Sequence, residues 1–165
     1  MRYLSLILVL SLWPAISRAQ VDRHKYPSVL ERERFKEMPQ DSEIQKLQKA
    51  IHNERLDIMT SSYLIFLGGW ENQCRPSLDS ARAFRSAAEV FVVDPKERKK
   101  LLEQLLDYHV QVANEVSLRE ANYQRMGKHA FSLQQQTLRE FRLELELELA
   151  KLKKAAKAEE PKKVK

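Results

Sequence analysis

The chain has 165 residues and a formal net charge of +6, and 32% of its residues are charged. A chain of this length is expected to hold a single domain. Its three glycines and six prolines are few for an all-β protein, whereas its abundance of Leu, Glu, Lys, Ala and Arg is typical of long helices and coiled coils.

The positive charge lies mostly at the C-terminal end. Residues 151–165 carry a net charge of +5, whereas residues 20–150 sum to −1. A nucleic-acid-binding protein gathers lysine and arginine on a folded face, so we expect no nucleic-acid partner. The Lys-rich tail is either a solvated end or a weak contact for an anionic surface, such as lipid headgroups or cell-wall polymers.

Residues 1–19 have the organisation of a secretory signal peptide. Arg2 supplies a positive charge, residues 3–13 form an apolar core, and small residues precede a predicted cleavage point before Gln20. The apolar core is shorter than the roughly 20 residues that span a bilayer. We therefore expect an exported protein, periplasmic or secreted, with an uncleaved membrane anchor as the alternative.

Residues 20–40 contain Pro27 and Pro39 and sustain no apolar period. This pattern indicates a linker or a disordered arm. A first helix is expected to begin at Asp41 or Ser42, because either side chain can accept hydrogen bonds from the exposed amide groups of a helix start.

The first helix is expected to pack through isoleucines that recur every seven residues. This spacing is typical of the seam between two packed helices. Gly69, with Gly68 before it, is expected to end the helix in a turn, since glycine accepts the left-handed conformation of a helix stop. The predicted seam contains Ile44, Ile51, Ile58 and Ile65, with Leu47 between the first two, and Leu56, Met59, Tyr63 and Phe66 widen it.

Residues 70–76 are expected to form a loop that contains Cys74, the single cysteine of the chain. An exported chain with one cysteine cannot form an internal disulfide, so Cys74 is either buried or a candidate for a disulfide between chains. Ser77 can cap the second helix. Residues 90–93 are interpreted as the end of that helix rather than as a strand, because no partner strand is predicted. The apolar face of this helix contains Leu78, Ala81, Phe84, Ala88 and Phe91.

The clearest helix start is Asp-Pro-Lys-Glu at residues 94–97, with a capping aspartate, a proline in the first turn and a glutamate placed to reach back. Gly127 interrupts the long helix that follows, and Ser132 can open the next one, so a turn is expected at residues 127–131. The apolar face between these points contains Leu102, Leu106, His109, Ala113 and Val116, with Leu101, Leu105 and Val112 beside them, and continues to Tyr123 and Met126.

The last helix contains the alternating stretch RLELELELAK at residues 142–151. Alternation is typical of a strand, but an apolar stripe at steps of three and four runs through the same residues, so we expect a helix. Leu143 and Leu147 then form a second apolar row, which indicates a further partner. The glutamates at positions 140, 144 and 148 are expected to form a solvated face rather than an acid–base pair. The main stripe contains Leu138, Phe141, Leu145, Leu149 and Leu152.

An offset of 55 residues aligns Ser77 with Ser132 and indicates an internal repeat of helix, glycine turn and helix. The predicted fold is therefore all-α, with two antiparallel helical hairpins or a coiled coil in an up-down arrangement. The first hairpin is expected at residues 41–93 and the second at residues 94–158, followed by a basic tail at residues 159–165.

Residues 121–152, ANYQRMGKHAFSLQQQTLREFRLELELELAKL, resemble the helical-hairpin segment of the outer-membrane efflux, or TolC-like, family, and residues 94–116 fit the helix before it. The segment also resembles small exported proteins, many of them from planctomycetes, that carry it alone. In the family, the hairpins build a periplasmic duct and their tips meet an adaptor protein. The tip residues that this resemblance implies are Tyr123, Gly127 and Ser132, with Gly69 and Ser77 as a weaker copy.

No catalytic or metal site is predicted. The four histidines form no metal-binding spacing, and the single cysteine completes no zinc set. His109 lies on an apolar face and is expected to be a buried core residue. The sequence contains no nucleophile elbow and no phosphate-binding glycine loop. We therefore expect a protein that is not an enzyme and that uses no cofactor.

These features predict an exported coiled-coil protein of the cell envelope that acts by helix–helix association. The expected partners are a further copy of the chain, in a homo-oligomer, or another helical envelope protein. Two alternatives are an accessory or degenerate component of a TolC-like efflux assembly, and a periplasmic chaperone or surface-binding module that uses the basic tail.

Overall fold

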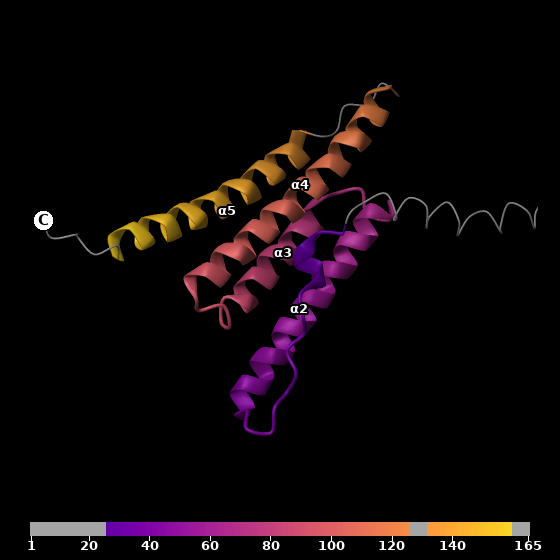
Figure 1. Cartoon of the computed structure of the whole chain (residues 1–165). Coiled ribbons are helices and arrows are strands. Elements are labelled where there is room, and N and C mark those ends of the chain that lie inside the picture. Colours follow the sequence, from indigo (N-terminus) through magenta and orange to yellow (C-terminus); the bar gives the residue numbers. More distant parts are fainter. Residues whose placement is uncertain (1–25, 126–131, 160–165) are drawn as a thin grey trace, which may run out of the picture.

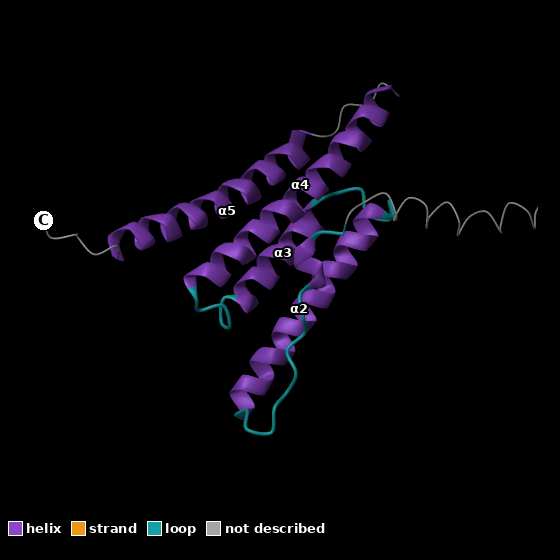
Figure 2. Cartoon of the chain, in the orientation of Figure 1, coloured by secondary structure: helices purple, strands orange, loops and turns teal. Residues whose placement is uncertain are grey.

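The computed structural model describes residues 26–125 and 132–159, and these residues form helices and connecting segments with no strand among them (Figures 1 and 2). This confirms the predicted all-α fold. The elements are a short 3-10 helix, η1 (Ser28–Glu31), and the α-helices α2 (Glu43–Leu67), α3 (Arg75–Ala88), α4 (Pro95–Arg125) and α5 (Ser132–Glu159).

Successive helices run antiparallel, in the predicted up-down order. In the first hairpin, the His52 ring of α2 lies 5.2 Å from the Phe84 ring of α3. In the second, the Arg98 guanidinium near the start of α4 lies 3.3 Å from the Glu148 carboxylate near the end of α5, and Figure 1 shows these two helices side by side. Both predicted hairpins are therefore present.

Three helix ends follow the sequence signals. The Ser42 hydroxyl accepts a hydrogen bond from the Gln45 amide at 3.2 Å, and the Gln45 side chain accepts one from the Ser42 amide at 2.9 Å, which is a reciprocal capping box. The glycine pair after α2 ends at Gly69, whose φ of +76° costs glycine little. At the start of α4, the Asp94 carboxylate accepts a hydrogen bond from the Glu97 amide at 3.2 Å.

The start of α3 differs from the prediction. Arg75 is its first residue and Cys74 occupies the N-cap position, so the prediction that Ser77 caps this helix is wrong. Pro76 favours the earlier start, because the amide that proline lacks has no partner in the first turn of a helix. Helix α3 ends at Ala88, so residues 90–93 lie beyond the helix, which corrects their interpretation as its end, and they form no strand.

The interior is formed by one face of each α-helix, and the predicted faces are the buried ones over residues 78–88 of α3, 101–116 of α4 and 138–152 of α5. Phe91 lies beyond the end of α3, and Met126 lies outside the described residues. The helical interpretation of residues 142–151 is confirmed, since Leu145 is fully buried whereas Leu143 is exposed. The Tyr63 ring of α2 lies 5.2 Å from the Tyr108 ring of α4, which joins the two hairpins. The fully buried large side chains are Tyr63, Tyr108, Phe66, Phe84, Phe141, Leu56, Met59, Leu78, Leu101, Leu102, Leu105 and Leu145.

The segment before α2, predicted to be a disordered arm, is packed on the fold from residue 26 onward, so that prediction is wrong for this part. Val29 and Leu30 in η1 are buried. The Asn53 side chain exchanges two hydrogen bonds of 2.9 Å with the backbone of Phe35. No apolar period marks this segment, because a short 3-10 helix and an extended segment bury isolated residues rather than a stripe.

Three predicted segments lie outside the described residues: the signal peptide at residues 1–19, the turn at residues 127–131 and the last residues of the basic tail, 160–165. The predictions about them stay predictions. Helix α5 continues to Glu159, so the second hairpin extends to the predicted start of the tail.

Val29→Ala is expected to lower the free energy of unfolding by about 1–2 kcal/mol, because it leaves a cavity beneath η1. Val93→Ala is a matched control: Val93 is 82% exposed, and its truncation is expected to change the free energy by less than about 0.5 kcal/mol. Urea titrations followed by far-UV circular dichroism measure both. Equal effects of the two substitutions would contradict the packing of this segment.

Candidate interaction surface

The isoleucine seam predicted on the first helix faces outward. As a prediction of packing it is wrong for the four isoleucines and Leu47, which are exposed, whereas the four residues predicted to widen the seam are buried. The side chains of the four isoleucines and Leu47 nevertheless keep the spacing of a helix–helix seam, and we call these five residues the isoleucine stripe. The exposed fractions are 68% for Ile44, 59% for Leu47, 53% for Ile51, 37% for Ile58 and 49% for Ile65.

Helix α2 has three faces, each about a third of a turn wide at roughly 100° per residue. One face packs into the core, and one is covered by the segment that precedes the helix. On the covered face, the Asn53 side chain exchanges two hydrogen bonds of 2.9 Å with the backbone of Phe35, and Arg34 forms an ion pair with Asp57. The third face carries the isoleucine stripe. The core face contains His52, Leu56, Met59, Tyr63 and Phe66.

Helix α5 carries a second, shorter apolar row. Leu143 and Leu147 are 52% and 56% exposed, as the sequence predicted for a row outside the main stripe. The two rows lie on the outermost helices of the fold, α2 and α5 (Figure 1). Exposed apolar side chains therefore lie at two edges of the fold, one on α2 and one on α5.

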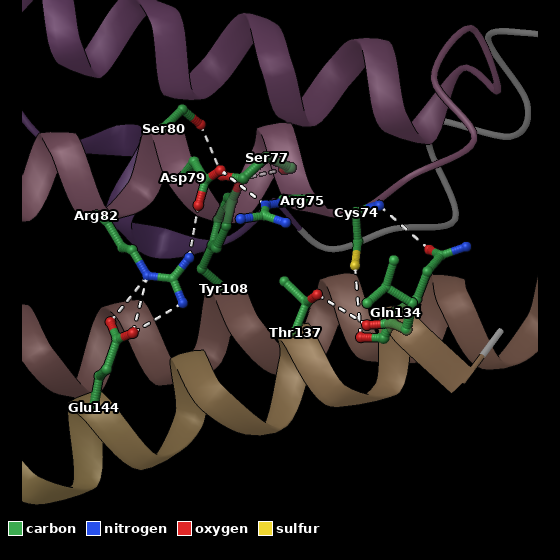
Figure 3. Close-up of polar contacts among 11 residues, drawn as sticks. Cys74, Arg75, Ser77, Asp79, Ser80, Arg82, Tyr108, Gln134, Thr137 and Glu144 are labelled. Atoms are coloured by element: carbon green, nitrogen blue, oxygen red, sulfur yellow. Dashed lines mark hydrogen bonds and ion pairs between the residues drawn. The ribbon is translucent and has the colours of Figure 1, made fainter.

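The acidic row of α5 is only partly solvated, which corrects the prediction of a solvated face. The Arg82 guanidinium of α3 donates to Glu144 at 2.9 Å through both its Nε and its Nη2 (Figure 3). A hydrogen bond from Lys151, together with the charge of Arg98, holds the pKa of the Glu148 carboxyl below its ordinary value. These ion pairs fix α5 against α3 and α4.

The turn that contains Gly69 is held by Arg119 of α4. The Arg119 guanidinium donates hydrogen bonds to the carbonyl oxygens of Phe66 and Glu71, the second at 2.9 Å. It also lies over the Phe66 ring, 4.2 Å from the centroid. The positive charge also lies beside the C-terminal end of α2, where the helix dipole favours a cation. The sequence analysis missed Arg119, because nothing local to it signals a contact with a turn about fifty residues earlier.

Gln134 of α5 holds the other part of the same connection. Its side-chain oxygen accepts a hydrogen bond from the Cys74 amide at 3.3 Å, and its side-chain nitrogen donates to the Asn72 carbonyl at 3.2 Å. The Cys74 side chain is fully buried, and its thiol points to the Gln134 carbonyl oxygen at 3.9 Å (Figure 3). A disulfide between chains would therefore require this end of the fold to open.

Ser77, predicted at a hairpin tip, lies in the interior. Its hydroxyl is 2.5 Å from the Tyr108 hydroxyl, which also donates to the Ser77 carbonyl oxygen at 3.1 Å (Figure 3). The Ser80 hydroxyl donates to the same carbonyl at 2.7 Å. Ser77 is thus a polar core residue and has no exposed surface to offer a partner.

The second predicted tip is described only in part. Gly127 lies outside the described residues, Tyr123 belongs to α4 and Ser132 is the first residue of α5. Since Gln134 contacts Cys74, the start of α5 lies beside the turn of the first hairpin. The structure therefore places the first predicted turn and the start of α5 at the same end of the fold.

The buried titratable groups, Cys74 and His109, have the properties expected of uncharged residues in a packed interior. Burial raises the pKa of the Cys74 thiol to about 11, so that little thiolate forms at neutral pH. His109 is buried, as expected, and its Nε2 lies 3.1 Å from the Leu138 carbonyl oxygen. Within residues 26–125 and 132–159, His, Cys, Asp and Glu side chains form no cluster of three that could hold a metal ion.

The chain matches no protein-family model, and no curated protein or solved structure is significantly similar to it. The resemblance to the TolC-like family therefore stays a prediction. Among the helices of the described residues, none combines the length and the apolar character needed to cross a bilayer.

The buried thiol of Cys74 is expected to react slowly with a thiol-specific reagent in the folded protein. Burial and the raised pKa both limit attack by the thiolate. At neutral pH, the reaction should proceed at least about a hundredfold slower than in urea-unfolded protein. Ellman's reagent measures both rates, and equal rates would contradict the burial of Cys74.

The stability of the fold is expected to fall as the pH is lowered from about 7 to about 5. Burial lowers the pKa of His52 and of His109 below 6.5, so the unfolded chain binds protons more tightly than the folded chain in this range. The contribution of the two neutral, buried histidines to the free energy of unfolding is present above pH 6.5 and is lost as the pH falls below it. His52→Phe should flatten this dependence, because the His52 ring already packs against the rings of Phe35, Phe84 and Phe91. Urea titrations at several pH values test this, and an unchanged slope would contradict it.

Proposed function

We propose that this chain is an exported helical interaction protein of the cell envelope that acts by helix–helix association through the isoleucine stripe of α2. The single observation that carries the proposal is the outward position of that stripe. Helix seams of this kind are normally buried against another helix. An exposed seam on a fold whose core is otherwise closed therefore favours a partner helix.

The position of the stripe favours a role in binding a partner over a role in packing the core of this chain. Ile51 is 53% exposed, whereas Met59 and Phe66 on the core face are fully buried. The core of the first hairpin is thus complete without the stripe, so that binding a partner need not disturb the fold. Large exposed apolar patches on soluble proteins commonly mark interaction sites.

Photo-cross-linking in producing cells tests the proposal. A photo-reactive benzoyl-phenylalanine in place of Ile51 is expected to yield a covalent adduct with a helical partner, which is either another copy of the chain or a different protein. The same residue in place of Lys99 is the matched control, because Lys99 has a side chain of similar exposure, 54%, on the polar side of α4.

The adduct from position 51 should be the stronger one by about tenfold or more, since a seam contact excludes solvent and holds the reactive group against its partner. Equal yields at the two positions, or no adduct at position 51, would overturn the proposed function. Far-UV circular dichroism of each purified variant verifies that the helices have formed.

A further inference from the structure

A cleft of about 440 Å³ lies between the segment that precedes α2 and the N-terminal part of α4. Its lining residues come from that segment, from α2, from the connection after α3 and from α4. Small-molecule sites in proteins have volumes of roughly 300–1,000 Å³ and combine apolar walls with a few polar groups. No member of the isoleucine stripe lines the cleft, so a ligand there is independent of the proposed helix–helix association.

Arg32 and Lys100 form the positive side of the cleft. The Arg32 guanidinium donates a hydrogen bond of 2.5 Å from Nη1 to the side-chain oxygen of Gln104. Burial lowers the pKa of Arg32, an effect that the charge of Glu97 only partly offsets. Among the described residues, neither Arg32 nor Lys100 forms an ion pair with a carboxylate. A partly buried cation without a bound anion costs free energy, which an anionic ligand can offset.

The edge of the Arg32 guanidinium that remains free is suited to a carboxylate. With Nη1 bonded to Gln104, Nε and Nη2 have no hydrogen-bond partner within residues 26–125 and 132–159. Arg82 binds the Glu144 carboxylate through this same pair of atoms. A planar guanidinium can donate two parallel hydrogen bonds to a carboxylate. Arg32 can therefore bind the carboxylate of a ligand in the same manner, and Lys100 adds a second positive charge.

Two carboxylates also line the cleft, those of Glu31 and Glu33. Both side chains are exposed, and neither forms an ion pair in the described part of the chain. The two negative and two positive charges of the lining therefore cancel. A ligand with a single negative charge would meet two carboxylates, and a ligand with a single positive charge would meet Arg32 and Lys100. A ligand that carries both an ammonium and a carboxylate is complementary to the whole lining.

The remaining wall of the cleft contains apolar and aromatic side chains, Phe35, His52 and Val92. The Phe35 ring packs against the His52 ring, with 4.6 Å between the ring centroids. Phe35 is nevertheless 37% exposed, so part of its surface stays open to a ligand. Aromatic side chains bury large areas and pair favourably with other rings. This wall is therefore suited to an apolar or aromatic side chain of the ligand.

We propose that the cleft binds a zwitterion with an apolar side chain, which is either a free α-amino acid or a short peptide. The carboxylate of the ligand binds Arg32 and Lys100. Its ammonium binds Glu31 or Glu33. Its side chain packs against Phe35.

Isothermal titration calorimetry of the purified chain tests the inference. L-phenylalanine is the probe for a free amino acid, and phenylalanylglycine is the probe for a short peptide. Two analogues keep the aromatic ring: 3-phenylpropanoate lacks the ammonium, and phenethylamine lacks the carboxylate. At least one of the two zwitterions is expected to bind about tenfold or more tightly than both analogues, because each analogue leaves charges of the lining without a partner.

The zwitterion that binds identifies the source of the ligand, since both carry the same recognised groups. Equal affinities of the zwitterions and the analogues would overturn the inference. The absence of saturable binding by both zwitterions at millimolar concentration would overturn it as well.

Charge-removing variants test the assigned contacts. Arg32→Gln is expected to weaken binding of the zwitterion about tenfold or more, because it removes the guanidinium fork. Arg34→Gln is the matched control: Arg34 belongs to the same segment, its side chain is 59% exposed, and it does not line the cleft. The control should keep the dissociation constant within about twofold. Equal effects of the two substitutions would contradict the inference.

Lys100→Gln provides a variant that leaves the fold undisturbed, because the Lys100 side chain is exposed and forms no hydrogen bond or ion pair among the described residues. It is expected to weaken binding about threefold or more, whereas Lys99→Gln, at an exposed position outside the cleft, should not. Far-UV circular dichroism verifies that each variant is folded. Unchanged binding by folded Arg32→Gln and Lys100→Gln would overturn the inference.

Discussion

The hydroxyl of Tyr108 links the two hairpins, and the register of the fold depends on it. A buried hydroxyl without a partner costs on the order of 1–3 kcal/mol, so a polar group beside the Tyr108 hydroxyl stabilises its position at the centre of the interior. Ser77 supplies both its hydroxyl and its carbonyl oxygen. This contact sets how far α3 and α4 slide along one another. The same register brings Arg119 to the end of α2 and lets Gln134 reach Cys74, so the connection between the hairpins is held by residues that the central contact has placed.

Local chemistry made much of this fold predictable. The caps at Ser42 and Asp94 and the stop at Gly69 act within one turn of the chain, and short-range patterns reveal them. The stripes that form the core of α3, α4 and α5 were also predictable, since each of these helices has one dominant apolar stripe. Contacts between distant residues were not predictable. No pattern near Ser77 predicts its contact with Tyr108, which lies 31 residues later in the chain. A serine before an apolar run is equally typical of a helix cap.

The sequence of α2 reveals the isoleucine stripe but does not show whether that stripe faces the core or the solvent. It carries two apolar stripes with nearly the same spacing, and periodicity reports the spacing without saying which stripe is buried. The aromatic content decides between them. Tyr63 and Phe66 offer more area for burial than isoleucine, and aromatic pairs add specific ring contacts, such as that between Tyr63 and Tyr108. The core therefore selects the aromatic stripe, and the isoleucines, which match the heptad more regularly, face outward.

The exposure of the stripe also bounds the strength of the association it can support. Full burial of an isoleucine or leucine side chain contributes roughly 1.5–3 kcal/mol, and the five members of the stripe are already about half buried. Burial of the exposed half of these side chains can therefore contribute on the order of 5 kcal/mol from this chain, with a similar contribution from a partner helix of matching apolar area. Association costs an estimated 4–15 kcal/mol in lost translational and rotational freedom, so that the two terms are of similar size. Such a balance favours reversible association. The division of α2 into a core face and an outer face thus keeps the fold independent of the association.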